Sequence, residues 1–291
     1  MDIQRPEVSN QGEPVQSNPI VHHRRPGRAL RMSVLTVAVV CALAGVALGA
    51  TLTGTNGANV LLGTAQPDTI NALGGNDIAY GFAMNDRISG GDGNDFLNGD
   101  GRIICPPGAT TLPYCTLLNS ETVGGNDRIR GEDGNDRIEG GRGNDLITGG
   151  LGRDSIRGER DDDRIDGGSG IDTLRGGSGN DKVTGGSGND IIFGDSGADR
   201  LTGGTGNDRI SGGSGNDRLS GTAGKDRLRG RAGNDVLIGG SARDTFSGGS
   251  GKDRIFARDG LRETIDCGSG RDVVHADGSD DVSSDCEVVG G

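Results

Sequence analysis

Aspartates recur every nine residues along most of this chain, and they are the residues best placed to do chemistry. Residues 203–220 read GGTGNDRISGGSGNDRLS, in which Asp208 and Asp217 each end a glycine-rich turn. The same spacing, broken once after residue 95, produces Asp68, Asp77, Asp86, Asp95, Asp127, Asp136, Asp145, Asp154, Asp163, Asp172, Asp181, Asp190, Asp199, Asp208, Asp217, Asp226, Asp235, Asp244 and Asp253. Regularly spaced carboxylates are ligands for hard cations, and Ca²⁺ takes about six to eight oxygens from carboxylates and backbone carbonyls.

Each of these acids is followed, two positions later, by an apolar residue with mostly polar flanks. These residues are Ile70, Ile88, Leu97, Ile129, Ile138, Ile147, Ile156, Ile165, Leu174, Val183, Ile192, Leu201, Ile210, Leu219, Leu228, Leu237, Phe246 and Ile255, with Ala79 as a small exception. The alternation predicts a three-residue strand whose apolar side chain turns inward. A helix is excluded because nine residues at about 100° each place successive acids on opposite faces. Three glycines per repeat would also cost a helix about 1 kcal/mol each.

The repeat therefore predicts an all-β fold, a parallel β-roll (a β-helix-like solenoid) with two short strands per 18-residue coil. Glycine-rich turns reverse the chain after each strand, so the coils stack as two parallel sheets with the aliphatic residues between them. Acids eighteen residues apart then lie about 4.8 Å apart on successive coils. Bare carboxylates at that distance repel by about 1 kcal/mol in bulk water, and by more at a protein surface. Since a cation between them reverses the sign, we expect folding and Ca²⁺ binding to be coupled.

The composition limits the classes of protein to which this chain can belong. It has 291 residues, of which 59 are glycine and 2% are aromatic, and a net charge of −12. Such values are common in disordered chains, but a strict internal period indicates a repeat fold instead. The acidic balance disfavours nucleic acid and anionic lipid as partners and favours cations. No zinc or nucleophile signature accompanies His22, His23 or His275, so we do not expect an enzyme.

The stretch GGxGxD followed by any residue and an aliphatic residue resembles the hemolysin-type (RTX) calcium-binding nonapeptide repeat. The resemblance covers residues 59–256. It implies a parallel β-roll in which several Ca²⁺ ions are held in the turns by this Asp and neighbouring turn carbonyls. It also implies a stand-alone, secreted calcium-binding protein of bacterial type, because only a signal-like segment precedes the repeats here.

The metal ligands that the resemblance implies fall into two groups. Complete GGxGxD turns lead to Asp95, Asp145, Asp154, Asp172, Asp181, Asp190, Asp208, Asp217 and Asp253. Turns that lose a single glycine lead to Asp136, Asp199, Asp226 and Asp235. Weak or empty sites are expected before Asp68, where the turn reads GTAQPD, and where Met84, Asp161 and Ala242 replace a glycine before Asp86, Asp163 and Asp244. Asp272 is a late copy that is out of phase.

The first 49 residues differ from the rest and predict export. Arginines precede an uncharged apolar run, SVLTVAVVCALAGVALGA at residues 33–50, which ends in small residues. This is the pattern of a secretory signal peptide, with cleavage near residue 49; the alternative is a membrane anchor over residues 33–50. Outside this run, Cys105, Cys115, Cys267 and Cys286 allow three pairings. Their clustering favours the local bridges 105–115 and 267–286, which need an oxidising compartment.

The remaining chain divides into four predicted parts. Residues 50–101 form a first β-roll segment and residues 123–256 the main β-roll. Between them, residues 102–122 form a loop insert pinned by a disulfide, or alternatively a protrusion for a cell-surface or matrix partner. Residues 257–291 form a C-terminal cap with a disulfide, because a stack of repeats needs its open end covered. The alternative function is therefore an adhesion or structural protein that uses the calcium-stiffened roll as a scaffold.

An arginine often follows the repeated acid, at Arg87, Arg128, Arg137, Arg164, Arg200, Arg209, Arg218, Arg227 and Arg254. We expect this slot to point outward, as a solvated face that offsets nearby aspartate charge. A stripe that binds a polyanion is the alternative, and it conflicts with the net charge.

Overall fold

The computed structural model describes residues 37–38, 49–100, 102–104, 116–118, 124–286 and 288–290. The predicted signal segment therefore lies almost wholly outside the described residues, as do Cys105 and Cys115. Residues Leu35–Gly291 form one compact unit. Among the described residues, no helix is long and apolar enough to cross a membrane.

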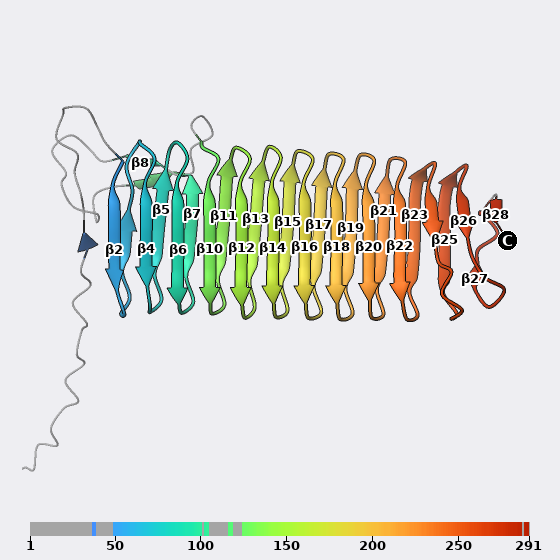
Figure 1. Cartoon of the computed structure of the whole chain (residues 1–291). Helices are drawn as coiled ribbons and strands as arrows, with labels where there is room; N and C mark the ends of the chain where they lie inside the picture. Colours follow the sequence, from blue (N-terminus) through green and yellow to red (C-terminus); the bar gives the residue numbers. More distant parts are fainter. Residues whose placement is uncertain are drawn as a thin grey trace, which may run out of the picture. The chain divides into compact units, whose positions relative to one another are not determined.

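Two 13-stranded parallel sheets build this unit, and outside the insert the chain alternates between them from one strand to the next (Figure 1). One sheet contains β2 (Thr51–Thr55), β4 (Thr69–Leu73), β6 (Arg87–Asp92), β10 (Arg128–Asp133), β12 (Leu146–Leu151), β14 (Arg164–Ser169), β16 (Lys182–Ser187), β18 (Arg200–Thr205), β20 (Arg218–Ala223), β22 (Val236–Ser241), β24 (Arg254–Phe256), β26 (Val273–His275) and β28 (Val288–Gly290). The other contains β1 (Val37–Ala38), β3 (Val60–Leu62), β5 (Ile78–Phe82), β7 (Phe96–Asp100), β11 (Arg137–Arg142), β13 (Ser155–Arg160), β15 (Thr173–Ser178), β17 (Ile191–Ser196), β19 (Arg209–Ser214), β21 (Arg227–Ala232), β23 (Thr245–Gly251), β25 (Thr264–Gly270) and β27 (Asp281–Val282).

The register of both sheets confirms the predicted 18-residue coil. Ile192 of β17 pairs with Ile210 of β19, and Leu201 of β18 pairs with Leu219 of β20. In the regular coils each strand thus meets the strand eighteen residues away, and the predicted β-roll with two strands per coil is confirmed. Across the insert the paired residues are 41 apart, as Arg87 and Arg128 are.

The strands are longer than the three residues that the alternation predicts. Most span six residues, as β19 does, and run on through the glycine pair of the next turn. Gly213 pairs in register with Asp195 below and Arg231 above, so the glycines belong to the sheet. This is possible because a residue without a side chain lets the backbones of neighbouring coils approach closely.

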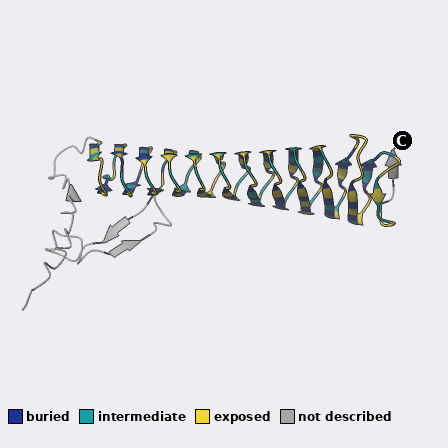
Figure 2. Cartoon of the chain, turned by 90° about the horizontal axis from the view of Figure 1, so that it is seen from below, coloured by how far each residue is buried: buried dark blue, intermediate teal, exposed yellow. Residues whose placement is uncertain are grey.

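The apolar residues predicted to face inward form one continuous core between the sheets. All of them, Ala79 included, are buried and belong to a single cluster (Figure 2). Leu52, Leu61, Ile265 and Val274 extend this cluster toward the two ends. The core is one aliphatic layer thick, which follows from one inward side chain per nine residues.

Two departures from the repeat interrupt or end the roll. Within the insert, β8 (Arg102–Ile104) pairs antiparallel with β9 (Thr116–Leu118). At the C-terminal end, Cys267 and Cys286 form a disulfide with Cα atoms 5.2 Å apart. Cys267 is fully buried against the core, so the disulfide joins the last segment to it.

Candidate metal centre

The turns repeat one backbone conformation, in which two positions have positive φ. These positions lie four and two residues before the repeated acid, as in Gly213 (φ 124°) and Gly215 (φ 128°) before Asp217. Residues other than glycine occupy them in several turns and keep the conformation: Leu73, Phe82, Met84, Glu132, Glu159, Asp161, Asp195, Thr222, Arg231 and Ala242. A missing glycine at these positions therefore adds strain without changing the path of the turn.

The repeated aspartates turn inward and are buried, each at most 3% exposed. One oxygen, Oδ1, accepts a hydrogen bond from the backbone N–H of the equivalent acid one coil earlier. Asp190 donates to Asp208 at 2.8 Å, and Asp208 donates to Asp226 at 2.8 Å. With few exceptions this hydrogen bond repeats from Asn59 to Asp272, and it crosses the insert, where Asp86 donates to Asp127. We call this series the aspartate ladder.

The second oxygen, Oδ2, is buried in most rungs of the aspartate ladder and has no hydrogen-bond partner in the described part of the chain. This holds for Asp77, Asp86, Asp95, Asp127, Asp136, Asp145, Asp154, Asp163, Asp172, Asp181, Asp190, Asp199, Asp208, Asp217, Asp226, Asp235, Asp253 and Asp272. A buried anionic oxygen without a partner is very costly, so it must carry a proton or face a cation.

A third glycine position creates the space for this oxygen. The glycine five residues before each acid has ordinary φ, but an added Cβ would collide with Oδ2. At Gly203 that Cβ would lie 2.2 Å from Asp208 Oδ2 and 2.9 Å from the Gly221 carbonyl oxygen. Ala72 and Cys267 occupy this position before Asp77 and Asp272. In other described turns glycine keeps it open.

A second hydrogen-bond series runs along the exposed rim of the turns. The side-chain oxygen of Asn207 accepts the N–H of Lys225, and that of Asn189 accepts the N–H of Asn207, at 2.8 and 2.7 Å. This series points the opposite way along the stack from the aspartate ladder. It explains the Asn-Asp pairs, to which the sequence pattern alone assigned no role.

Carbonyl oxygens in the turns are also available. In the described structure, the Gly206, Gly215 and Gly233 carbonyl oxygens accept no hydrogen bond, whereas the Asp208 carbonyl accepts the N–H of Arg227. Each turn therefore combines a buried carboxylate oxygen with a free backbone carbonyl. Such all-oxygen sets with negative charge suit Ca²⁺, so the residues present fit the ion that the repeat predicts.

Burial raises the pKa of the ladder carboxyls in the metal-free protein. Desolvation is the main cause, and neighbouring rungs add repulsion. The pKa rises to about 8 for Asp86 and Asp163, to about 7 for Asp199 and Asp235, and to about 10 for Asp145. The hydrogen bond to Oδ1 opposes the shift in each case, without cancelling it.

The structure places all thirteen predicted ligand residues, from Asp95 to Asp253, in this one environment. The four turns that were expected to be weak fall into two groups. Asp86 and Asp163 have the same unpartnered Oδ2, whereas Asp68 Oδ2 accepts the Thr64 N–H and Asp244 lacks a buried unpartnered oxygen. Asp77 and Asp127 share the environment without having been predicted as ligands. The sequence missed Asp127 because the insert separates it from its glycine. Gly99, which precedes the insert, supplies the open space beside Asp127 Oδ2.

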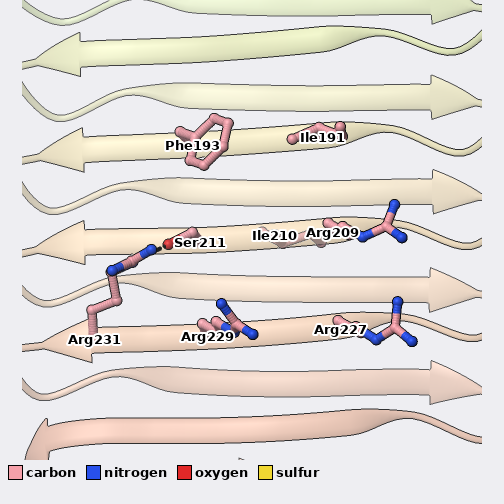
Figure 3. A pocket seen from close by; sticks show the side chains of 8 residues that line it. All are labelled: Ile191, Phe193, Arg209, Ile210, Ser211, Arg227, Arg229 and Arg231. Atoms are coloured by element: carbon pink, nitrogen blue, oxygen red, sulfur yellow. Dashed lines mark hydrogen bonds between the residues drawn. The ribbon is translucent and has the colours of Figure 1, made fainter.

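The arginines that follow the acids point outward, as predicted. Arg164, Lys182, Arg200 and Arg218 stand in register on four successive strands, and each side chain is exposed. On the other sheet, an open pocket of about 390 Å³ crosses β17, β19 and β21 (Figure 3). Its lining residues are Ile191, Phe193, Arg209, Ile210, Ser211, Arg227, Arg229 and Arg231. This face is basic but shallow, and polyanion binding there stays a prediction.

Comparisons with known proteins identify the repeat. A family model described as the RTX calcium-binding nonapeptide repeat (4 copies) matches residues 53–81, 80–101, 122–156, 142–174, 157–192, 166–201, 193–228 and 220–255. Among solved structures, the chain is similar to a hyperactive, Ca²⁺-dependent, β-helical antifreeze protein from an Antarctic bacterium. The two are 20% identical over 83% of this chain and 80% of that chain, with a TM-score of 0.36. No curated protein matches the chain.

We predict that Gly203→Ala weakens the roll because its Cβ would displace Asp208 Oδ2. The expected loss is about 1–3 kcal/mol of unfolding free energy at saturating Ca²⁺, together with a higher calcium midpoint. Denaturant unfolding followed by circular dichroism measures both. Gly57→Ala is the matched control, since the nearest atom to its Cβ is 3.9 Å away. Equal effects from the two substitutions would contradict this role for Gly203.

The raised pKa values predict an unusual pH dependence for the metal-free roll. The folded state holds protons more tightly than the unfolded chain, whose aspartates have a pKa of 3.8. The stability that these groups contribute is therefore fully present below about pH 4 and is lost as pH rises through the folded values, which run from about 6 for Asp172 through about 8 for Asp163 to about 10 for Asp145. Circular dichroism in a calcium chelator, at low protein concentration, should show strand signal lost across this window. A strand signal that grows with pH in chelator would show that the ladder carboxyls are not the cause.

Proposed function

Because this chain belongs to the RTX calcium-binding nonapeptide repeat family, we propose that it is an exported protein whose roll folds when Ca²⁺ occupies its turns. The ligands on this proposal are Asp95, Asp136, Asp145, Asp154, Asp172, Asp181, Asp190, Asp199, Asp208, Asp217, Asp226, Asp235 and Asp253. Asp77, Asp86, Asp127 and Asp163 join them, since their Oδ2 atoms have the same surroundings.

The observation that carries the proposal is the row of buried, unpartnered Oδ2 atoms. At neutral pH a proton could satisfy only the carboxyls whose pKa is raised far enough, and several, such as Asp172 and Asp208, rise only to about 6. These must be ionised and buried at pH 7, which needs a counter-charge inside the turn. Bound Ca²⁺ supplies that charge and completes its own shell with turn carbonyls.

The thin core makes folding depend on this binding. One aliphatic side chain per nine residues buries little apolar surface to oppose the entropy of ordering those residues. A ligand that binds only the folded roll stabilises it by mass action. Folding and calcium binding are then a single equilibrium over the repeats.

Export would give this roll the calcium it needs. The basic and apolar pattern of residues 1–49 and the Cys267–Cys286 disulfide support an oxidising compartment outside the cytosol. On this proposal, mass spectrometry of the protein collected from culture medium finds a chain that begins near residue 50. A cell-bound chain that retains residues 33–50 would support the membrane anchor instead.

The alternative role in cell-surface or matrix adhesion depends on residues 102–122. Of this insert the structure describes only β8 and β9, and no described contact favours a partner. The adhesion role therefore stays a prediction from the sequence.

A calcium titration tests the proposed function directly. We expect little strand signal at pH 7.4 in chelator, and a cooperative rise at about 0.1–1 mM free Ca²⁺, the range of extracellular modules. Magnesium at the same concentration should not substitute, because it demands octahedral geometry and gives up water reluctantly. A strand signal of equal size in excess chelator would rule out coupled folding.

Paired variants locate the effect in the aspartate ladder. The double variant Asp190→Asn, Asp208→Asn removes two successive rungs, and should raise the calcium midpoint several-fold. The control, Asp133→Asn, Asp166→Asn, removes the same charge from exposed strand positions and should leave the midpoint in place. If the control shifts the midpoint as much as the ladder variant, general charge and not the turn sites controls calcium binding.

A further inference from the structure

The last coils contain a glutamate where the aspartate ladder would place an aspartate. Thr264 of β25 pairs with Thr245 of β23, so Glu263 occupies the rung that follows Asp244. It comes ten residues after Asp253, because the preceding turn is one residue longer. The ladder then continues, since the Glu263 N–H donates to Asp280 Oδ1 at 3.1 Å.

The longer side chain of Glu263 leaves the ladder. The residue is 1% exposed, and in the described structure neither Oε1 nor Oε2 accepts a hydrogen bond from an N–H or hydroxyl group. The carboxyl of Asp280 lies within hydrogen-bonding reach of the Glu263 side chain. In a regular rung one of these oxygens would accept the N–H of Asp244, and here neither does. The additional methylene of glutamate therefore places the buried carboxylate beyond the Asp244 N–H, which a ladder aspartate would bind.

Two further carboxylates converge on Glu263 from successive turns. Asp259 lies between β24 and β25, and Asp277 lies between β26 and β27. Carboxylate oxygens of Asp259, Glu263 and Asp277 all lie within 4.8 Å of one another. These residues follow residue 255, where the matches to the repeat family end.

Backbone groups hold the two aspartates in place. Asp259 accepts the N–H groups of Ala242 and Leu261, at 3.1 and 2.8 Å. Asp277 accepts the N–H of Gly260 at 2.8 Å, and its own N–H donates to Asp280 Oδ2 at 2.8 Å. The carboxylates are thus positioned by the fold and kept near each other despite their charge.

We propose that Asp259, Glu263 and Asp277 form a separate site for one hard divalent cation, of the Ca²⁺ class, that closes the C-terminal end of the roll. Three carboxylates supply only oxygen ligands and three negative charges, which suit Ca²⁺. They include no thiolate or imidazole, the donors that softer metals such as Zn²⁺ prefer. Glu263 supplies two oxygens that accept no N–H or hydroxyl group, with the Asp280 carboxyl beside them, and so fits bidentate binding. The ion would link the turn after β24 to the turn after β26, and the Cys267–Cys286 disulfide ties the same region to the core.

This end site differs in kind from the turn sites of the repeats. Its ligands come from three different positions in two irregular turns, whereas each repeat turn contributes the same Asp. It would protect the open edge of both sheets, the place where a stack of coils begins to fray. The site therefore predicts a calcium response in the cap that can be read separately from that of the roll.

Hydrogen exchange of the full-length protein, read by mass spectrometry of peptides across a CaCl₂ titration, separates the two responses. In the unchanged chain, Ca²⁺ should protect amides of residues 257–282. Glu263→Gln and Asp277→Asn should each shift the calcium midpoint of that protection at least about tenfold, while residues 164–240 keep theirs. Asp281→Asn is the control, because its exposed carboxylate lies 3.9 Å from Arg262 and outside the cluster.

The variant Glu263→Asp distinguishes metal binding from plain structural support. The shorter side chain restores the regular rung to Asp244, so the roll should remain folded while the cap loses its own calcium response. A merely structural carboxylate would be replaced by aspartate without loss. The proposal is overturned if Glu263→Asp retains the calcium midpoint of residues 257–282, or if Glu263→Gln and Asp277→Asn behave like Asp281→Asn.

Discussion

The burial of one carboxylate oxygen in every nine residues is the constraint on which this structure depends. The aspartate ladder places Oδ1 against a backbone N–H of the neighbouring coil and leaves Oδ2 inside the turn without a partner. The first oxygen joins coils into a stack with a row of hydrogen bonds that is broken only between Asp244 and Glu263 among the coils from Asp77 to Asp272. The second creates a charge that the protein itself does not neutralise. Stacking and the need for a cation are therefore two consequences of the same side chain.

The glycines of the repeat serve this carboxylate in different ways, and the structure separates their roles. Positions four and two residues before the acid need positive φ, which Met84, Asp161 and Ala242 also adopt. At the position five residues before the acid, glycine leaves open the space beside Oδ2, with Ala72 and Cys267 as exceptions before Asp77 and Asp272. A missing glycine at a positive-φ position therefore leaves the surroundings of Oδ2 unchanged at Asp86 and Asp163, and the weaker binding expected there stays a prediction.

Periodicity alone predicted most of the fold, because a fixed repeat determines which residues stack. The 18-residue register, the two sheets and the inward aliphatic residues from Ile70 to Ile255 all followed from spacing. The orientation of each carboxylate did not, since it depends on an N–H group one coil away. The sequence did not reveal that Gly99 and Asp127 belong to one turn, because the insert lies between them. Glu263 was missed because a single added residue shifts the phase, so that it no longer matches the nine-residue count.

The outward arginines cannot replace the cation that the ladder requires. Arg209 follows Asp208 directly, yet successive side chains of a strand point to opposite faces, so its guanidinium is on the outer face while Oδ2 is buried. Among the described residues, arginines form ion pairs with Glu139, Asp195 and Asp281, none of which belongs to the ladder. The arginines reduce the negative charge of the surface, but they do not neutralise the buried carboxylates. An ion small enough to enter the turn can meet that charge, and the turn carbonyls beside Oδ2 are placed to complete its shell.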